Sequence, residues 1–448
     1  MASAAEQLAA NINFSAFAKA PELKKRLWFT LGALIIYRLG TYIPIPGVDP
    51  QILEEIFSQQ AGGMLGVFDM FAGGALGRMT IFALNIMPYI SAAIIMQLLT
   101  AVSPTLEALK KEGEAGRKKI NQYTRYGTVL LAVFQSYGIA VGLESTTGSA
   151  GSAVIDPGMF FRITTVITLT GGTIFLMWLG EQITQRGVGN GISLIIFAGI
   201  VANLPLALVQ VLELGRTGVL GPLLIVALLI GAVAVIAFIV YIERAQRRIV
   251  VQYPKRQVGN KMFGGEASHL PLKLNPSGVI PVIFASSLLL LPATVGGFSG
   301  AGGPEWLNWV NIYLAHGTPL FMVLYAALII FFAFFYTGIV FNPDDTADNL
   351  KKHGGFVPGI RPGKNTGDYL RHIIMRLGAV GAAYLALVAL LPEFLRAQYP
   401  ALPFYFGGTS LLIVVTVTMD TVGQIHAHLL AHQYEGLIKK SKLKGRRG

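Results

Sequence analysis

Long uncharged stretches alternate with short polar connections along most of this chain. A helix needs about 20 residues to cross the hydrocarbon core of a bilayer, which is about 30 Å thick. Ten stretches come close to that length, uncharged except that Arg38 interrupts the first, and they cover residues 27–43, 79–102, 126–143, 163–180, 192–212, 220–242, 277–295, 318–341, 377–392 and 404–419. The pattern predicts an all-α polytopic membrane protein with ten transmembrane helices.

Basic residues follow the same alternation. Of the 35 Lys and Arg, 30 lie in every second connection or at the two ends of the chain. The remaining five are Arg38, Arg78, Arg162, Arg216 and Arg396. Because basic loops are retained on the cytoplasmic side during insertion, we expect both termini and the long basic loops 243–275 and 342–371 in the cytoplasm.

Composition indicates that lipid is the main solvent. Only 13% of the 448 residues are charged and 53% are hydrophobic, whereas a soluble domain carries roughly 25% charged residues. The net charge of +12 lies in loops and tails beside the spans, which favours anionic lipid or an acidic cytoplasmic partner over nucleic acid. The chain contains no cysteine, which excludes disulfides and thiolate chemistry. Residues 1–26 show no signal-peptide pattern and are expected to form a cytoplasmic N-terminal segment.

The two long basic loops differ in their predicted structure. Residues 247–251 have the composition of a strand and Tyr253-Pro254 that of a turn, so a hairpin standing into the cytoplasm is expected in the first loop. The second loop contains breakers such as Asn342-Pro343 and Gly354-Gly355, which predict a structured irregular loop rather than a helix.

One apolar segment is too short to span. Residues 63–78 are apolar but reach only about half the length that crossing requires. Irregular backbone exposed to lipid is forbidden in the hydrocarbon, so this half-helix either lies flat at the interface or enters a cavity lined by protein. The pair Gly73-Gly74 would let it hinge.

The sequence contains no convincing catalytic or metal-binding constellation. The segment Pro362-Gly363-Lys364-Asn365 lacks the glycine and hydroxyl positions of a phosphate loop, which excludes nucleotide binding there. His426, His428 and His432 lack a suitably spaced glutamate and are interpreted as a solvated cluster. Asp420 is the only acid found near a span interior, which weakens an ion-coupled transporter. We therefore expect no enzyme activity, no cofactor and no metal.

Several long motifs carry a resemblance to a known family. They are GALI at 32–35, YIPIPG at 42–47, IFALNIMPYIS at 81–91, GEQIT at 180–184, GNGIS at 189–193, VPGIRPG at 357–363 and FYFGGTSLLI at 404–413. Together they resemble the SecY family, which forms the channel of the bacterial Sec protein translocase. The resemblance extends from about residue 23 to residue 444.

The resemblance implies a clamshell of two pseudo-symmetric five-helix halves, 27–212 and 220–430, joined by an outer hinge loop at 213–219 and followed by a basic tail at 431–448. It implies a gated channel for unfolded preproteins that narrows to an aliphatic ring. The matching ring positions are Ile86, Ile90, Ile192, Ile196, Ile283 and Ile413. Without the resemblance, ordinary helix packing would explain these isoleucines.

The resemblance also assigns roles to three further groups of residues. The half-helix, residues 64–78, would be a plug below the ring, with Met64, Phe68, Asp69, Phe71, Gly73, Gly74 and Arg78. A lateral gate, through which membrane-protein helices pass into lipid, would include Ser91, Gln135, Asn275 and Leu291. The docking surface for a motor or ribosome would include Arg247, Arg248, Lys255, Arg256, Lys261 and Arg361. Asn260-Lys261 stands where many relatives carry an Arg-Arg pair, a departure that bears on the strength of docking.

The implied partners are the small subunits SecE and SecG, the SecA ATPase, the translating ribosome, substrates with signal sequences and anionic lipid. The implied location is the bacterial inner membrane, and a partner would supply the energy. Two other functions remain open at this point. One is an ion-coupled secondary transporter, and the other is an insertase or lipid scramblase without a pore through it.

Overall fold

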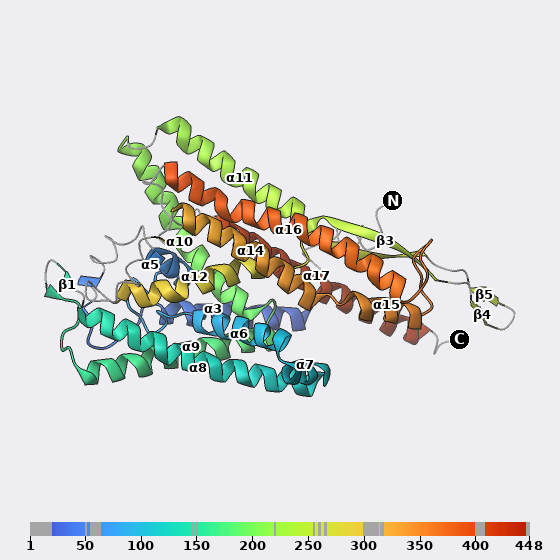
Figure 1. The fold of residues 1–448 in the computed structure, drawn as a ribbon, viewed down its shortest axis with the longest axis horizontal. Helices are drawn as coiled ribbons and strands as arrows, with labels where there is room; N and C mark the ends of the chain where they lie inside the picture. Colours follow the sequence, from blue (N-terminus) through green and yellow to red (C-terminus); the bar gives the residue numbers. More distant parts are fainter. Residues whose placement is uncertain are drawn as a thin grey trace. The chain divides into compact units, whose positions relative to one another are not determined.

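The computed structural model describes residues 20–49, 52–53, 64–145, 147–148, 151–218, 221–253, 256–258, 261–263, 267–298, 313, 318–398 and 408–444. Over these residues the chain is mostly helical (Figure 1). The helices are α3 (Pro21–Gly40), α5 (Met64–Ala72), α6 (Met87–Val102), α7 (Pro104–Lys111), α8 (Glu114–Ser145), α9 (Met159–Arg186), α10 (Gly191–Arg216), α11 (Pro222–Arg244), α12 (Ile280–Phe298), α14 (Pro319–Val340), α15 (Pro343–Lys352), α16 (Lys364–Gln398) and α17 (Gly408–Lys444). The strands are β1 (Thr147–Gly148), β2 (Gly151–Ser152), β3 (Gln246–Gln252), β4 (Arg256–Val258), β5 (Lys261–Phe263) and β6 (Ala267–Lys273).

Each of the predicted apolar stretches overlaps a described helix. Among the described residues, seven helices are long and apolar enough to cross a membrane, or eight if α6 and α7, which are bent by 98° at their junction, count as one span. The shorter apolar helix Ile280–Leu289 accounts for the described part of the seventh stretch. The prediction of an all-α polytopic membrane protein is confirmed.

Two local predictions were wrong. The second stretch was expected to be helical from residue 79, but α6 begins at Met87, because Met79 and Asn85 adopt positive φ angles of 44° and 50°. Residues 343–352 were expected to be irregular, yet they form α15. The side chain of Asn342 accepts a hydrogen bond from the Asp344 amide at 3.2 Å, so Asn-Pro here is a helix start rather than a breaker.

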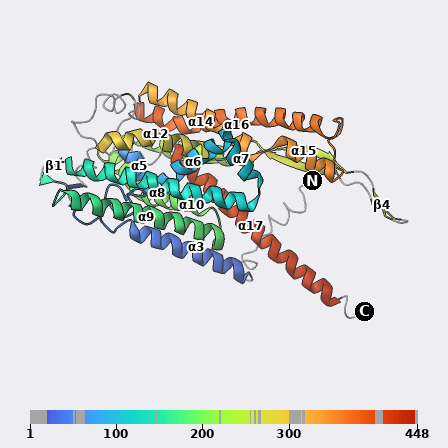
Figure 2. The same cartoon turned by 60° about the horizontal axis from the view of Figure 1, so that its bottom comes forward.

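By compactness the chain divides into two units, and the first comprises residues 1–208, 292–311 and 413–448. Within it, α8 packs along α9, and both lie side by side in Figures 1 and 2. An ion pair ties the two helices together near each end. Arg125 binds Glu181 through two hydrogen bonds of 2.9 and 2.7 Å, and Arg162 binds Glu144 at the other end.

The second unit comprises residues 209–291 and 312–412. Its strands β3 and β6 pair in an antiparallel register from Gln246–Lys273 to Gln252–Ala267, which confirms the predicted hairpin. The short pair β4 and β5 lies beyond β3, at the far end of this hairpin in Figure 1. Gln252 also forms a bridge with Phe356, so the hairpin is bonded to the second basic loop.

The two basic loops of this unit share one small core. It contains Ile249 and Leu272 from the hairpin, Val357 from the second loop, and Leu370, Ile373, Ile374 and Leu377 from α16. Burial of these side chains from different segments fixes the hairpin on α16. The loops therefore form one body, which we call the basic platform: β3, β6, residues 353–363 and the first turns of α16.

We predict that Leu370→Ala loosens the basic platform, because Leu370 is completely buried in this core. A cavity of this kind costs about 2–5 kcal/mol. Amide hydrogen exchange of β3 and β6, measured by mass spectrometry in nanodiscs, should accelerate. Val250→Ala is the control, since Val250 lies on β3 but is 39% exposed. Equal exchange in the two variants would contradict the shared core.

Candidate functional site

The half-helix α5 spans nine residues, Met64–Ala72. At 1.5 Å per residue it is about 14 Å long, less than half the thickness of a hydrocarbon core. Directly after it the chain reverses at Gly73 and Gly74, whose φ angles are +66° and +81°. Glycine adopts such angles more readily than any other residue, so this pair favours the reversal.

The reversal packs directly against the backbone of α10. A Cβ atom added to Gly73 would lie 2.9 Å from the Cα of Gly199, and one added to Gly199 would lie 2.6 Å from the carbonyl oxygen of Phe71. Neither space admits a methyl group without a shift of backbone. The end of α5 therefore packs closely against α10 at Gly73 and Gly199, which face each other.

Two arginines converge on the carbonyl group of Gly73. Arg38 of α3 donates from Nη1 at 2.7 Å, and Arg78 donates from Nη2 at 3.2 Å. Both guanidinium groups lie over the ring of Tyr42, at 5.0 and 4.3 Å from its centroid. We call this set, Arg38, Tyr42, Gly73 and Arg78, the arginine latch.

Neighbouring carbonyl groups at the end of α5 are also bonded by side chains. Asn85 donates from Nδ2 to the carbonyl of Phe71 at 2.6 Å, and the Tyr37 hydroxyl donates to that of Ala72 at the long distance of 3.4 Å. A helix leaves its last four carbonyls without partners inside the helix. Here side chains bond three consecutive carbonyls, those of residues 71, 72 and 73, and the Ala75 amide also donates to the carbonyl of Ala72 at 3.3 Å. Asn tolerates the left-handed backbone found at Asn85 better than most residues.

Asp69 folds the following loop back onto α5. Its Oδ1 atom accepts a hydrogen bond from the Gly77 amide at 2.7 Å. Burial raises the pKa of Asp69, while this bond and the charge of Arg78 act in the opposite direction. Phe71 is buried, whereas the side chains of Met64 and Phe68 lie outside the described residues. The end of the predicted half-helix is thus hydrogen-bonded to side chains of α3 and to Asn85, and it packs against α10.

The isoleucines expected to form a ring are divided between the two units. Ile86, Ile90, Ile196 and Ile413 are buried in the first unit, where Ile192 is half-buried. Ile283 is buried in the second unit. Ile86 immediately precedes α6, and it follows Asn85, so the turn that bonds α5 also fixes the start of the helix that carries Ile90. A ring formed by all six stays a prediction.

The four residues expected at a gate are likewise divided. Ser91 on α6 and Gln135 on α8 are buried in the first unit, and the Oε1 atom of Gln135 has no hydrogen-bond partner there among the described residues. Asn275 is buried in the second unit, where it donates to the Glu243 carboxylate at 2.8 Å. The side chain of Leu291 lies outside the described residues.

The basic platform presents the residues expected to dock a partner. Arg247 and Arg248 are exposed on β3. Val357-Pro358-Gly359-Ile360 forms a turn in which the Ile360 amide donates to the Val357 carbonyl at 3.1 Å, with Gly359 at φ +81°. This turn presents the exposed Arg361. Arg256 and Lys261 lie on β4 and β5, but their side chains, like the whole of Lys255, lie outside the described residues.

Several residues of this site were missed at the level of sequence. Arg38 was noted only as an interruption of the first span, and Tyr42, Asn85 and Gly199 were given no role. Their signal was weak, but an isolated arginine within an apolar span indicates a polar contact inside the protein.

Comparison with known proteins identifies relatives over most of the chain. A family profile described as SecY matches residues 80–422. The protein translocase subunit SecY of Rickettsia conorii is 56% identical over 423 residues, which are 94% of this chain and 97% of the relative. That of Escherichia coli K12 is 56% identical over 425 residues, 95% of this chain and 96% of the relative. A solved structure described as a protein-conducting channel superposes with a TM-score of 0.64 at 19% identity, covering 91% of this chain and 92% of that one.

We predict that Gly199→Ala unseats the end of α5. The added methyl group would meet the Phe71 carbonyl at 2.6 Å, so either α10 or α5 must move. Hydrogen exchange across residues 66–86 should become faster, while the helicity of the whole chain by circular dichroism stays unchanged. Gly171→Ala in α9 is the control, because its Cβ meets nothing within 4 Å. Unaltered exchange in Gly199→Ala would refute the close seating.

Proposed function

This chain belongs to the SecY family of protein translocase subunits, and we propose that its half-helix α5 is the plug of the channel, held shut by the arginine latch. The chain is a polypeptide-conducting channel in the inner membrane of a bacterium, not an enzyme. The observation that supports α5 as the plug is its bonding. A nine-residue helix too short to span is fastened at one end by side chains rather than by helix continuation.

The arginine latch suits a plug that must keep the channel closed and must still be able to move. Its bonds to Gly73 come from charged donors, which contribute about 1.5–3 kcal/mol each, and stacking on Tyr42 adds about 0.5–2 kcal/mol. Displacing α5 would break these bonds together, while water entering the opened path would hydrate both guanidinium groups and the carbonyl. The closed state would therefore be favoured in the absence of substrate but reversible when a chain enters.

The six isoleucines would form the constriction above this plug. An aliphatic ring can close around a threaded chain of any sequence, because its contacts do not depend on matching polar groups. When empty it excludes water by dewetting. Ser91, Gln135, Asn275 and Leu291 would line the lateral gate, where the polar members make separation of the closed surfaces less costly than an entirely aliphatic seam.

The basic platform would receive the partner that supplies energy. Arg247, Arg248 and Arg361 are exposed on one rigid body and can meet the phosphates of ribosomal RNA or the acidic surface of a motor such as SecA. Arg256, Lys255 and Lys261 would extend this surface toward the hairpin tip. A solved Sec61 structure in a canine ribosome-channel complex superposes with a TM-score of 0.60 at 18% identity, covering 91% of this chain and 92% of that one, which supports the fold but not the partner.

Small membrane subunits such as SecE and SecG would cover part of the remaining surface. The most apolar of the candidate spans is α11, and only 6% of its most apolar 18 residues are buried within the chain. Lipid or partner helices must therefore surround it. Both termini and the basic platform would face the cytoplasm, and anionic lipid headgroups would meet the basic loops.

We predict that Arg38→Gln, Arg78→Gln and the double variant raise the resting leak of the channel. Loss of one charged donor, at about 1.5–3 kcal/mol, should increase the open probability at least about tenfold, since 1.4 kcal/mol corresponds to a factor of ten. The measurement is ion conductance of the complex with its small subunits in planar bilayers, without substrate. Arg216→Gln is the control, because Arg216 is exposed and pairs only with Glu213 on its own helix among the described residues. A leak no larger than that of the control would exclude the latch as the closing element.

We also predict that Arg361→Glu blocks docking without unfolding the platform. Reversing this exposed charge should reduce motor-driven import of a preprotein into vesicles at least tenfold, by repulsion of an acidic surface. Import is measured as preprotein protected from added protease, and exchange of β3 and β6 reports folding. Arg216→Glu serves as the control for the change in net charge. Unchanged import would remove Arg361 from the docking surface.

A further inference from the structure

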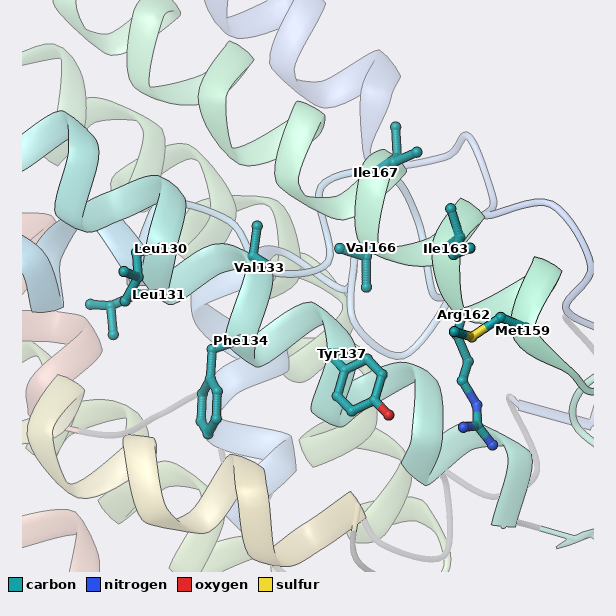
Figure 3. Close-up of a pocket in the computed structure, with 10 residues that line it drawn as sticks. All are labelled: Leu130, Leu131, Val133, Phe134, Tyr137, Met159, Arg162, Ile163, Val166 and Ile167. Atoms are coloured by element: carbon teal, nitrogen blue, oxygen red, sulfur yellow. The ribbon is translucent and has the colours of Figure 1, made fainter.

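A groove of about 540 Å³ lies between α8 and α9, and it contributes to none of the roles above. Figure 3 shows Leu130, Phe134 and Tyr137 from α8, and Ile163, Val166 and Ile167 from α9, among the side chains that line it. Its volume falls in the range of small-molecule sites. All of these residues belong to one compact unit.

The groove opens onto the lipid-facing surface. Both α8 and α9 are long and apolar enough to cross a membrane. Phe134 is 64% exposed and Ile167 is 67% exposed, although such side chains are normally buried in a protein that is surrounded by water. A hollow between two helices in this position is filled either by lipid or by a helix of another protein.

The polar groups of the groove stand at one end of it. In Figure 3, Tyr137 and Arg162 lie toward one end, and Leu130 and Leu131 lie at the other. Arg162 is in the first turn of α9, which starts at Met159. Tyrosine and arginine at a helix end are typical of the boundary between hydrocarbon and headgroups.

The ion pair at this end exposes its cation more than its anion. Arg162 donates from Nε and Nη2 to Oε2 of Glu144 at 2.8 and 2.6 Å, and the Gly158 amide donates to Oε1 at 3.0 Å. The Glu144 side chain is 10% exposed, whereas that of Arg162 is 35% exposed. Glu144 therefore fixes the orientation of the guanidinium group, and the guanidinium is the more exposed member of the pair.

We propose that the α8–α9 groove holds one phospholipid, with an acyl chain along the apolar floor and the phosphodiester at Arg162. The polarity of the groove matches that of such a lipid: a long apolar channel ends at an oriented guanidinium, which binds phosphate oxygens well. A partner helix would match the apolar floor but would bring no phosphate to the exposed side of the guanidinium group, which is 35% exposed in its pair with Glu144. The end concerned is opposite the basic loop before α8, so this lipid lies in the leaflet away from the basic platform if the proposed topology holds.

The test uses the purified complex in nanodiscs of phosphatidylglycerol and phosphatidylethanolamine, with a diazirine in the acyl chain of a trace phosphatidylglycerol. After illumination, mass spectrometry should find cross-links to Phe134 or Ile163 at least threefold above those to Ile174, which is a lipid-facing residue of α9 outside the groove. Val166→Trp, which fills the groove, should lower this yield to the background. Ile174→Trp should leave it unchanged.

A second measurement tests the phosphate contact. After delipidation, native mass spectrometry should detect one retained phosphatidylglycerol but no retained diacylglycerol, and millimolar inorganic phosphate should not displace the lipid. Arg162→Gln leaves Glu144 without its cation, so the double variant Glu144→Gln/Arg162→Gln is measured beside it. Both should lose the retained lipid by at least threefold while their circular dichroism stays unchanged.

Three results would overturn the proposal. Cross-link yields equal at Phe134 and Ile174 would mean that only bulk lipid touches the groove. Equal retention of diacylglycerol and phosphatidylglycerol would remove the phosphate contact. A photoreactive amino acid at Phe134 that captures a protein rather than lipid in native membranes would assign the groove to a partner helix.

Discussion

Backbone carbonyl groups inside a membrane protein must find partners within the protein, and the end of α5 shows how this chain meets that requirement. A helix leaves its last four carbonyls without partners inside the helix, and at the end of the nine-residue α5 the amides of the following turn bond those of Asp69, Met70 and Ala72. Asn85, Tyr37, Arg38 and Arg78 bond the carbonyls at residues 71, 72 and 73. The glycine turn and these side chains together give the end of α5 its hydrogen-bond partners.

For α5 as the proposed plug, the same requirement links closure of the channel to its opening. A helix that continued through the membrane would satisfy its own carbonyls and could not be displaced without disrupting a span. A helix whose terminal carbonyls are bonded by side chains can be displaced from its position, provided that water bonds those carbonyls when the channel opens. Gly73 and Gly74 form the reversal, and Gly199 allows the end of α5 to contact the backbone of α10 directly.

Patterns of hydropathy and residue type along the sequence predicted the helices, the hairpin and the half-helix, because neighbouring residues largely determine these elements. The uncharged stretches located the helices, the strand composition of residues 247–251 located the hairpin, and the short apolar segment located α5. The predictions failed at the starts of two helices, α15 and α6. Asn342-Pro343 was interpreted as a breaker, although Asn before Pro also starts helices, and the start of α6 was placed too early because positive φ angles at Met79 and Asn85 are not visible in hydropathy.

The latch itself could not be predicted from such patterns. Arg38 and Gly73 are 35 residues apart, and Arg78 and Thr41, which also share a hydrogen bond, are 37 apart. Contacts at this separation depend on tertiary packing. The most direct test of the account is a stalled preprotein that carries one cysteine, combined with Ile86→Cys, Ile283→Cys or Ile174→Cys in the otherwise cysteine-free chain. The account predicts disulfides to the first two positions and none to the lipid-facing third, together with faster hydrogen exchange of α5. Disulfides at the third position alone, with α5 still protected, would contradict it.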